Sequence, residues 1–576
     1  MSFDTLIMKK ITAELQKDLG GAAAQRISEP NRGEIVIDFY GQARQLNLLF
    51  SLESKYARIH LTGAPEKKKL KGEQPSPFCM LLRKYLVGGR AVSFTNPPME
   101  RIMEIDFDPP DGLPPVKLIA EIMSRRSNLI LVDQNNIILG AAKTVSWEKN
   151  PLRAIQPGEP YRPVPPQNKL NPLALSLSEL ETAVKALLHE GKKPEQALFS
   201  AVDGISPLTA RELLFRSSWD KGNFAGSFEQ LHAEITDLFS RVEQGTLHPV
   251  MLPGRKIYAA MPLDHLQEEE QTPFENANKM LDHFYKALIN SEREKALRAQ
   301  LNTAVEKRLT ALEKKLREQR KELEATEKAP AYRLYGELLL AYGDRVPRGA
   351  EDVALPDLYN PDTNVIVPLN PSKNAGANAQ AYFNRYRRAK NGRDKVKKQL
   401  ARTGSELDYC RGLLYTIESG SGSSLHEIKQ ELIDAGFLRD KQKGKKRVDA
   451  LPQPLTFKSS SGRTILVGRN NRQNDYVTFK AAVRRDTWFH IRQIPGSHVV
   501  LKEAPFPPPE QDCEEAAFLA AYFSKGRESG AVDIDYTEVR HVRRRPGGQP
   551  GAVFYENYET ITVNPLDSDM RKRFGL

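Results

Sequence analysis

Residues 486–501, DTWFHIRQIPGSHVVL, form the stretch from which this chain is best interpreted. They predict two short strands joined by a turn at Pro495-Gly496-Ser497, because Pro presets φ and Gly tolerates a positive φ. Two histidines, His490 and His498, fall near this turn. A plain hairpin core with polar ends explains the pattern, and a functional site is the alternative.

The length and charge of the chain restrict its class. With 576 residues it is too long for one core, so we expect several domains. The formal net charge of +12 favours a polyanionic partner over a generally solvated surface, because the basic residues cluster. The clusters are Lys67-Lys68-Lys69, residues 439–447 and residues 540–545.

The cysteine and hydropathy patterns predict a cytoplasmic protein. Cys79, Cys410 and Cys513 lie far apart and form no CxxC motif, which argues against a disulfide framework and a structural zinc site. No apolar run approaches the roughly 18 residues needed to span a bilayer. The first residues have no signal-peptide pattern, and we expect no contact with a membrane.

Residues 1–172 are predicted to form an α/β module. Phe3, Ile7, Ile11, Leu15 and Leu19 recur every four residues, which indicates an amphipathic helix. The other predicted elements are helices at 77–87 and 115–123, strands at 34–40, 45–52, 56–61, 91–95 and 101–107, and a hairpin of 128–133 with 137–141. The proline-rich residues 157–172 predict a boundary.

Residues 173–273 are predicted to be a helical region followed by a short β-containing connection. The expected helices are 177–190, 193–201, 207–217 and 227–244. The turn at residues 203–207, DGISP, resembles a helix-hairpin-helix corner, with Ser206 as the N-cap and Pro207 at the first helical position. Such a corner either offers backbone N–H groups to a phosphate or is a plain connection.

Residues 274–437 are predicted to form a coiled-coil hairpin. One arm carries apolar residues near heptad spacing, and a second seam runs from Tyr382 through Arg393, Thr403 and Cys410 to Leu414 in steps of four and three. We expect the two arms to pair within one chain, with a small helical head between them at residues 329–380; a homodimeric coil is the alternative. A helix at 425–437 follows.

Residues 438–454 are predicted to be a basic linker, and residues 455–576 a last α+β domain. The predicted strands are 464–467, 477–479, 488–492, 498–502, 533–540, 552–555 and 560–563, with a helix at 510–524. A polar loop of Asn470, Asn471, Arg472 and Gln473 is a candidate RNA contact, and a turn that satisfies its own backbone is the simpler interpretation.

Familiar catalytic motifs are absent from the sequence. There is no GxxxxGK[ST], HExxH or GxSxG, and acidic residues form no paired-carboxylate motif. We therefore expect no catalytic residue, no metal and no cofactor, and we predict that the chain is not an enzyme.

Several stretches together resemble the NFACT family over essentially the whole chain. They are VGRNNRQND (467–475) with residues 486–501, FCMLLRK (78–84) before Gly88-Gly89, SNLILVD (127–133), PGEPY (157–161) and NPSKNAGANAQAYFNRYRRAK (370–390). The resemblance implies an α+β multidomain fold. It would comprise a glycosylase-like N-terminal NFACT-N module, a helix-hairpin-helix region, a long antiparallel coiled coil with a helical head, and a C-terminal NFACT-R module.

The resemblance also implies a set of RNA-binding residues. The early aspartate of the family is matched by Asp4, and its Asp-Arg pair by Glu100-Arg101, where the longer glutamate departs from the pattern. Arg125 and Arg126 are further tRNA-binding candidates; the family often has histidine where this chain has Arg126. In the last domain the RNA-binding candidates are Asn470, Asn471, Arg472, His490, His498, Arg543, Arg544 and Arg545.

The family comprises, in bacteria, RqcH-type ribosome quality-control factors formerly described as fibronectin-binding proteins. The implied role is to bind the large (50S) subunit, its 23S rRNA and an obstructed peptidyl-tRNA, and to recruit alanyl-tRNA for alanine tailing without mRNA. A small S4-like RNA-binding partner and a monomer on the subunit are also expected. The alternatives are a surface adhesin and a DNA-repair enzyme; the glycosylase chemistry is rejected because Ser2 and Phe3 replace its N-terminal proline and glutamate.

Overall fold

The structure is a computed structural model that describes residues 3–41, 44–63, 74–110, 112–219, 224–360, 362–420, 422–439, 452–545 and 549–576. The chain divides into two compact units, Met1–Ser291 and Glu292–Leu576. Ser2, the cluster Lys67-Lys68-Lys69 and most of the predicted basic linker lie outside the described residues, and the predicted domain bounds stay predictions. No helix in the described ranges is long and apolar enough to cross a membrane.

Unit 1 is built on an antiparallel sheet whose strand order is β4-β3-β2-β1-β5-β6-β7-β8-β9. Its strands are β1 Ala23–Ser28, β2 Glu34–Gly41, β3 Arg44–Ser51, β4 Arg58–Thr62, β5 Arg90–Thr95, β6 Ile102–Asp108, β7 Val116–Glu121, β8 Asn128–Asp133 and β9 Ile138–Ala141. The two halves of the sheet meet where β1 pairs with β5 through Ala23 and Arg90.

Two assignments in this sheet differ from the prediction. The helix predicted at 115–123 is wrong, because Val116–Glu121 is a strand, β7, that pairs with β6 on one side and with β8 on the other. A short apolar run fits a buried strand as well as a helix, and the two neighbouring strands decide between them. Strand β1 was not predicted, because its sequence AAQRIS has no clear apolar alternation.

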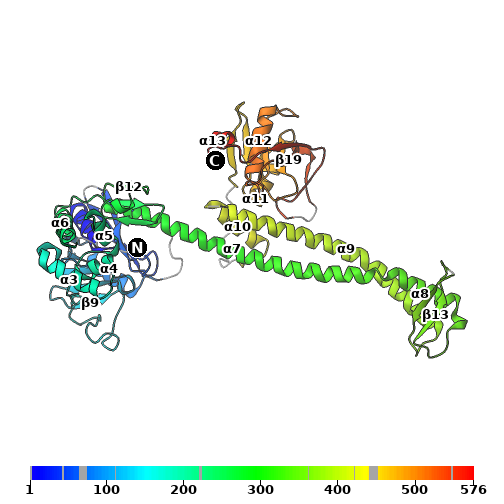
Figure 1. The fold of residues 1–576 in the computed structure, drawn as a ribbon, viewed down its shortest axis with the longest axis horizontal. Coiled ribbons are helices and arrows are strands. Elements are labelled where there is room, and N and C mark those ends of the chain that lie inside the picture. Colours follow the sequence, from blue (N-terminus) through cyan, green and yellow to red (C-terminus); the bar gives the residue numbers. More distant parts are fainter. Residues whose placement is uncertain are drawn as a thin grey trace. The chain divides into compact units, whose positions relative to one another are not determined.

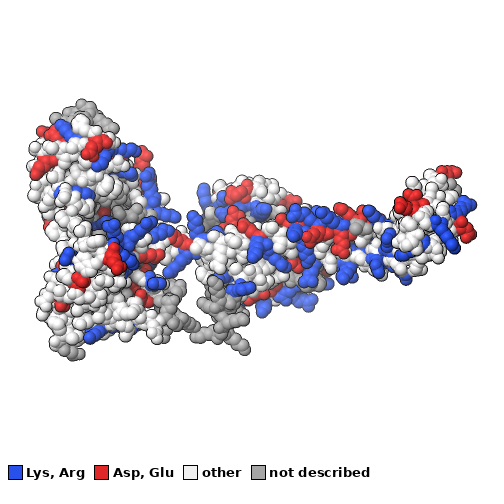
Figure 2. Space-filling view, turned by 90° about the horizontal axis from the view of Figure 1, so that it is seen from below, with Lys and Arg blue, Asp and Glu red and all other residues white. Residues whose placement is uncertain are grey.

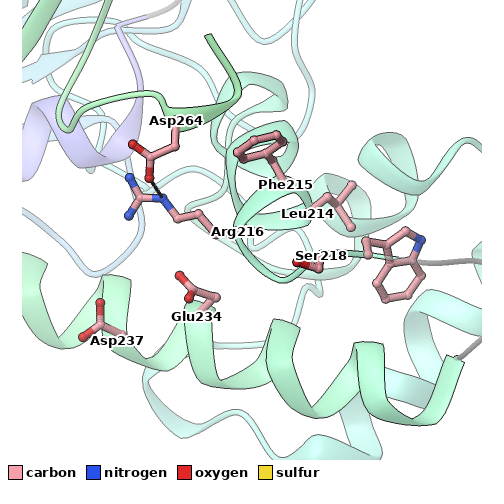
Figure 3. Close-up of a pocket in the computed structure, with 8 residues that line it drawn as sticks. Leu214, Phe215, Arg216, Ser218, Glu234, Asp237 and Asp264 are labelled. Atoms are coloured by element: carbon pink, nitrogen blue, oxygen red, sulfur yellow. Dashed lines mark ion pairs between the residues drawn. The ribbon is translucent and has the colours of Figure 1, made fainter. Parts of the chain in front are cut away.

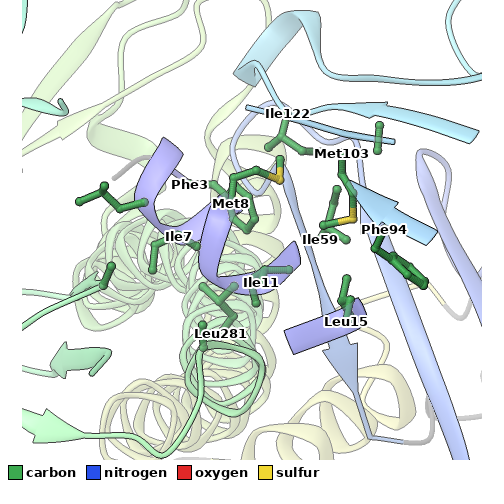
Figure 4. Close-up of a cluster of buried hydrophobic side chains, with 14 of the residues drawn as sticks. Phe3, Ile7, Met8, Ile11, Leu15, Ile59, Phe94, Met103, Ile122 and Leu281 are labelled. Atoms are coloured by element: carbon green, nitrogen blue, oxygen red, sulfur yellow. The ribbon is translucent and has the colours of Figure 1, made fainter. Parts of the chain in front are cut away.

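The helix α1, Thr5–Leu19, lies in the main core of unit 1. Its residues Ile7, Ile11 and Leu15 are fully buried, as the four-residue spacing predicts, and they meet side chains from the sheet and from the start of α7, such as Leu281 (Figure 4). A second helix, α2, Pro77–Leu86, is N-capped by Ser76.

The predicted helices of the second segment are all present. They are α3 Leu177–His189, α4 Pro194–Ala201, α5 Pro207–Arg216 and α6 Phe224–Glu243, followed by the short strands β10 Val250–Leu252, β11 Ile257–Ala259 and β12 Thr272–Pro273. Apolar residues of these helices and of the first turns of α7 belong to the same core as α1. The first two predicted segments therefore fold around shared side chains.

Unit 2 contains two long antiparallel helices, α7 Ala277–Thr326, which begins in unit 1, and α9 Ala375–Ser419 (Figure 1). Arg308 pairs with Glu406 at 2.9 Å, and Arg298 Nη2 donates to the Gly420 carbonyl oxygen at 2.7 Å, which fixes the opposite direction of the helices. Lys and Arg side chains are interspersed with Asp and Glu on the face of these helices that Figure 2 shows.

The buried seam of the pair differs from the predicted one at its last step. Leu407 and Cys410 are buried as expected, but Leu413 and Ile417 follow, and Leu414 is only partly buried. The reason is the helix α10, Ser423–Asp434, whose apolar face packs on the same cluster. The buried positions at the end of α9 therefore follow the side of the helix that contacts α10.

The segment between the arms is not wholly helical, which corrects the predicted helical head. It contains α8, Ala329–Ala341, and an antiparallel hairpin of β13, Asp352–Pro356, with β14, Asn364–Pro368. Leu355 and Val367 of the hairpin pack against Leu338 and Leu339 of α8. Two short apolar runs in this segment, VALP and VIVP, are flanked by Asp and Asn, which is a strand signal. The high Pro and Asn content of the segment obscured it in the sequence.

The last domain is a sheet of order β15-β16-β18-β17-β19-β22 that packs on the buried helix α12, Glu510–Tyr522. The predicted hairpin is confirmed, because Trp488 pairs with Val500 across β17 and β18. The elements are β15 Leu455–Lys458, β16 Thr464–Val467, α11 Asn471–Tyr476, β17 Thr487–Ile491, β18 Val499–Leu501, β19 Val532–Glu538, β20 Val542–Arg544, β21 Val553–Tyr555, β22 Glu559–Val563 and α13 Ser568–Phe574.

One strand predicted in this domain is wrong. Residues Val477–Ala481 continue α11 as a π-helical turn, in which Val477 and Thr478 are buried. Their β-branched side chains suggested a strand, but the preceding helix and the contact of Thr478 with His498 hold the segment helical.

Candidate nucleic-acid interface

The predicted residue Asp4 lies at the start of α1. It is the N-cap of the helix, and its Oδ1 accepts a hydrogen bond from the backbone N–H of Ile7 at 3.1 Å. The cap satisfies one of the free donors of the first turn. The residue also interacts with the side chain of Ser206, the N-cap of α5. Two helix starts that are some 200 residues apart in sequence therefore meet at Asp4.

The predicted pair Glu100-Arg101 follows a tight turn that is held from both sides. Asn96 Nδ2 donates to the carbonyl oxygens of Glu100 at 2.9 Å and of Ile102 at 2.6 Å. On the other side, Thr5 Oγ1 donates to the carbonyl oxygen of Met99 at 3.4 Å, and Met99 has a positive φ of 57°. This turn therefore connects the pair to the first residue of α1.

The turn at residues 203–207, which was predicted as a helix-hairpin-helix corner, closes the group. Gly204 has a φ of +73°, and a Cβ there would lie 2.8 Å from Met99 Sδ, so the backbone of the corner packs directly on the turn before Glu100. The predicted capping by Ser206 is confirmed: its Oγ accepts from the Thr209 N–H at 3.2 Å. We call the group of Asp4, Glu100, Arg101, Asp203 and Ser206 the corner cluster.

Two carboxyl groups of the corner cluster have a raised pKa. Burial raises the pKa of Asp4, and the Ile7 N–H, Ser206 and Arg101 only partly oppose it. Burial and the neighbouring Asp203 raise the pKa of Glu100, and Arg101 opposes them. Hydrogen-bond donors or cations of a ligand would stabilise the charged form of both carboxyl groups. Binding of donors such as ribose hydroxyls or base amino groups would therefore stabilise the charged carboxylates of the cluster.

Arg125 and Arg126 lie at the same end of the sheet as the corner cluster. They are exposed on the short helix η1, Ser124–Arg126, which directly follows β7, and the last residue of β7 pairs with Ile102. The neighbouring motif PGEPY has a structural role, because Tyr161 Oη donates to the buried Glu121 at 2.9 Å.

The predicted polar loop at residues 470–473 is instead the start of α11, which corrects that assignment. Asn470 is its N-cap, and the side-chain amides of Asn470 and Gln473 both donate to Glu427 Oε2 of α10 at 2.7 Å. Asn471 donates to Glu431 Oε1 of α10 at 2.9 Å. These amides are engaged by carboxylates within unit 2, and their role in RNA binding stays a prediction.

Arg472 lies in the same contact. It is partly buried, and its charge opposes the burial that raises the pKa of Glu431.

His490 and His498 belong to an aromatic cluster around the fully buried Trp488. The His490 ring is stacked on Trp488 at a centroid distance of 5.6 Å, and the His498 ring meets it edge-on at 5.1 Å. His498 Nδ1 bonds to Thr478 Oγ1 at 2.8 Å. Burial lowers the pKa of His490 to about 4 and that of His498 well below its ordinary value, so both rings are neutral at pH 7.

The arginines Arg543, Arg544 and Arg545 have separate surroundings. Arg543 is exposed and faces Glu556 at 3.5 Å. Arg544 forms a bidentate pair with Asp475, with both distances 2.8 Å. Arg545 Nη1 donates to Ser405 Oγ of α9 at 3.3 Å. Arg543 and Arg544 are exposed, and Arg545 is partly buried.

An open pocket lies at the other end of α5 from the corner cluster (Figure 3). Acidic side chains of Glu234, Asp237 and Asp264 line it, and its one basic residue, Arg216, is paired with Asp264 at 3.1 Å. Walls of this charge repel a polyanion, so this pocket does not suit RNA.

The convergence of the corner cluster is the feature that the sequence analysis missed. Asp4, Glu100 and Arg101 were predicted as sites and residues 203–207 as a corner, but nothing in the sequence placed them together. Asp203 was predicted only as part of that corner, and Thr5 and Asn96 were not predicted as site residues. The only local signal for Asn96 in the sequence is its position beside the Pro-rich turn in TNPPMER (95–101), where an amide side chain can bond to the turn backbone.

Two family models match the chain. The NFACT N-terminal and middle domains match residues 4–450, and the NFACT protein RNA binding domain matches residues 453–557. Similar proteins include the Rqc2 homolog RqcH of Bacillus subtilis, 33% identical over 578 residues with 99% of each chain covered. The Rqc2 homolog RqcH of Streptococcus suis is 32% identical, again with 99% of each chain covered.

Two solved structures are also similar to parts of the chain. Both come from the fibronectin/fibrinogen-binding protein of Streptococcus suis. Its C-terminal part is 32% identical with a TM-score of 0.39, covering 49% of this chain and 99% of that one. Its N-terminal part is 28% identical with a TM-score of 0.41, covering 50% of this chain and 100% of that one.

Proposed function

This chain belongs to the NFACT family, and we propose that it is a ribosome quality-control factor that binds large ribosomal subunits obstructed by peptidyl-tRNA. It recruits alanyl-tRNA there and promotes addition of alanine residues to the stalled chain without mRNA, which marks the chain for degradation. The peptidyl-transferase centre of the ribosome forms the peptide bonds. The protein itself therefore needs no catalytic residue, metal or cofactor.

The convergence of the corner cluster is the observation that carries this proposal. Arg101 can form forked hydrogen bonds to a phosphate or a base edge, and Glu100 and Asp4 can accept from ribose or base donors. These groups come from three distant segments and are held by the turn around Met99, the cap of α1 and the corner at Gly204. A surface ion pair would not require such support.

The other partners follow from the family membership. The C-terminal residues match an RNA-binding domain, which supports contacts with 23S rRNA or tRNA. The protein acts as a monomer on the 50S subunit in the cytoplasm, together with a small S4-like RNA-binding partner. The mixed charges on the long helices suit contacts with a surface of both RNA and protein (Figure 2).

Sequencing the RNA that accompanies the protein from cell lysate tests the proposal directly. We expect large-subunit rRNA without small-subunit rRNA, together with one enriched tRNA. Equal amounts of both subunits would indicate a general ribosome factor instead. Absence of RNA above background would refute the proposal.

A pair of substitutions tests the corner cluster itself. Glu100→Ala with Arg101→Ala should leave subunit binding largely intact and remove tail synthesis, and Glu100→Asp should retain it. The matched control is Glu181→Ala with Lys185→Ala, which removes a partly exposed ion pair of the same charges on α3. Loss of subunit binding in the first variant, with its folding intact, would show that the pair is not a tRNA contact.

A surface adhesin is the second candidate function. It is favoured by one observation: the similar Streptococcus suis protein is a fibronectin/fibrinogen-binding protein. Cell fractionation separates the two candidates: a mostly surface-bound pool would support the adhesin, and a ribosome-bound pool the quality-control factor.

A further inference from the structure

We propose that one end of the C-terminal sheet is the surface on which this domain binds the phosphate backbone of RNA. We call it the basic edge and define it by Lys480, Arg484, Arg485, Lys502 and Arg540. The inference rests on the proposed function for the choice of partner, and on the geometry of the sheet for the choice of residues.

The register of the sheet brings these residues to one end. Thr487, at the start of β17, pairs with Leu501 at the end of β18 and with Glu538 at the end of β19. Arg484 and Arg485 precede β17, Lys502 follows β18 and Arg540 follows β19. Neighbouring strands lie about 4.8 Å apart, so the cations form a row rather than a point.

Backbone contacts hold the row in place. The Arg540 N–H donates to the Arg484 carbonyl oxygen at 3.1 Å. Lys502 Nζ donates to the Ala481 carbonyl oxygen at 2.9 Å, which joins the end of the π-helical turn to β18. The loop before β17 is therefore fixed against both neighbouring strands, and its two arginines are presented from a rigid support.

The nearby acidic groups leave the row positive. The buried Asp486 carboxylate accepts from the N–H groups of Val483 at 2.8 Å and Glu503 at 3.0 Å, so it holds the loop. Glu538 pairs with Arg540, and Glu503 is exposed nearby. For Lys480, Arg484 and Arg485, which are exposed, no ion pair occurs among the residues that the structure describes.

The opposite end of the same strands is already engaged. After β16, Asn470 and Gln473 bond to Glu427 of α10, and the His498 N–H just before β18 donates to Asn474 Oδ1. The contact with α10 therefore uses one end of the strands, and the basic edge lies at the other end. Within unit 2 the domain can hold α10 and RNA at the same time.

A linear polyanion is the ligand that fits this edge. Guanidinium groups suit phosphate oxygens through forked hydrogen bonds, and a row of cations matches successive phosphates. The exposed Val483 lies between Lys480 and Arg484, and it could rest against a ribose or base. An anionic membrane is the other partner with a repeated phosphate charge, and it is an outcome of the test below.

The test measures binding of the full-length protein to labelled single-stranded polyuridine RNA from about 50 mM to about 200 mM KCl. The variant is Arg484→Ala with Arg485→Ala. Two lost phosphate contacts reduce the slope of log K against log salt by about 1.4, so the wild type should lose about sevenfold more affinity than the variant over this range. The matched control is Lys525→Ala with Lys572→Ala, two exposed lysines outside the edge.

Each outcome decides the proposal. Equal salt slopes for wild type and variant, or an equal loss of slope in the control, would refute it. Binding of the wild type to phosphatidylserine vesicles but not to RNA would assign the edge to membranes. Sedimentation of the wild type with purified large subunits is measured separately. If only this binding fails, the proposed function is refuted but the RNA-binding role of the basic edge is not.

Discussion

Lowering the pH from 7 to 5 should loosen β17 and β18 because the folded domain keeps His490 and His498 neutral. The unfolded chain binds a proton on each ring as the pH falls through the ordinary histidine pKa of about 6.5, whereas folded His490 does so only near its pKa of about 4. The unfolded state therefore binds more protons between these values. Stability is present above this window and is lost as the pH falls through it.

The magnitude follows from the two pKa values of His490. At pH 5 the unfolded state gains about 2 kcal/mol over the folded state from this ring, and at pH 7 only about 0.2 kcal/mol. Burial also holds the pKa of His498 well below its ordinary value, so its ring acts in the same direction. Because His490 is partly exposed, about 2 kcal/mol for its ring is an upper estimate.

Hydrogen–deuterium exchange of the full-length protein measures the effect locally. The opening free energy of β17 and β18 amides, corrected for the intrinsic exchange rate at each pH, should fall from pH 7 to pH 5. His490→Asn should reduce the fall by up to about 2 kcal/mol, the contribution of its ring. The reasoning is refuted if protection is equal at both pH values. It is also refuted if His490→Asn weakens RNA binding at pH 7 while protection stays unchanged, because the ring would then be an RNA contact.

Three further predictions concern the support of the site and the arm. Gly204→Ala should lower the stability of unit 1 by about 1 kcal/mol or more and weaken tRNA binding, since its Cβ would clash with Met99 at a positive φ; thermal unfolding and tRNA binding check this. Asn96→Ala should reduce tail synthesis but not subunit binding, because it frees the turn that carries Glu100-Arg101. Arg298→Ala should lower the opening free energy at the end of α9 by about 1–2 kcal/mol, because Arg298 binds carbonyl groups there. Faster hydrogen–deuterium exchange of these amides would show it.

The fold could be predicted where the local signal agrees with the tertiary environment. The spacing of Ile7, Ile11 and Leu15 and the cap at Ser206 are local features, and both helices start as expected. Residues 116–121, VKLIAE, were assigned wrongly because such a short, mostly apolar run carries no period that separates strand from helix. Only the neighbouring strands settle it, and pairing between strands is not written in the run itself.

The candidate site shows the same limit more sharply. Single residues such as Arg101 could be predicted from the resemblance, but the basic edge could not. Arg484 and Arg485 look like an ordinary pair before a strand, and they join Arg540 only through the register of β17 with β19. Conversely, Asn470 looked free to bind RNA, and the structure uses its amide to hold α10. Charge and polarity in sequence do not reveal which groups the fold itself engages.

Asp4 shows why a structural and a functional interpretation of one residue can both hold. An aspartate before an amphipathic run predicts an N-cap, and the Ile7 N–H indeed bonds to its Oδ1. A cap of this kind would be equally satisfied by asparagine or serine, so it does not require a charge. Burial raises the pKa of Asp4, and Arg101 and the cap of α5 oppose this only in part. The cap thus explains the position of Asp4, and a ligand that donates to its carboxylate is the role that we propose for its charge.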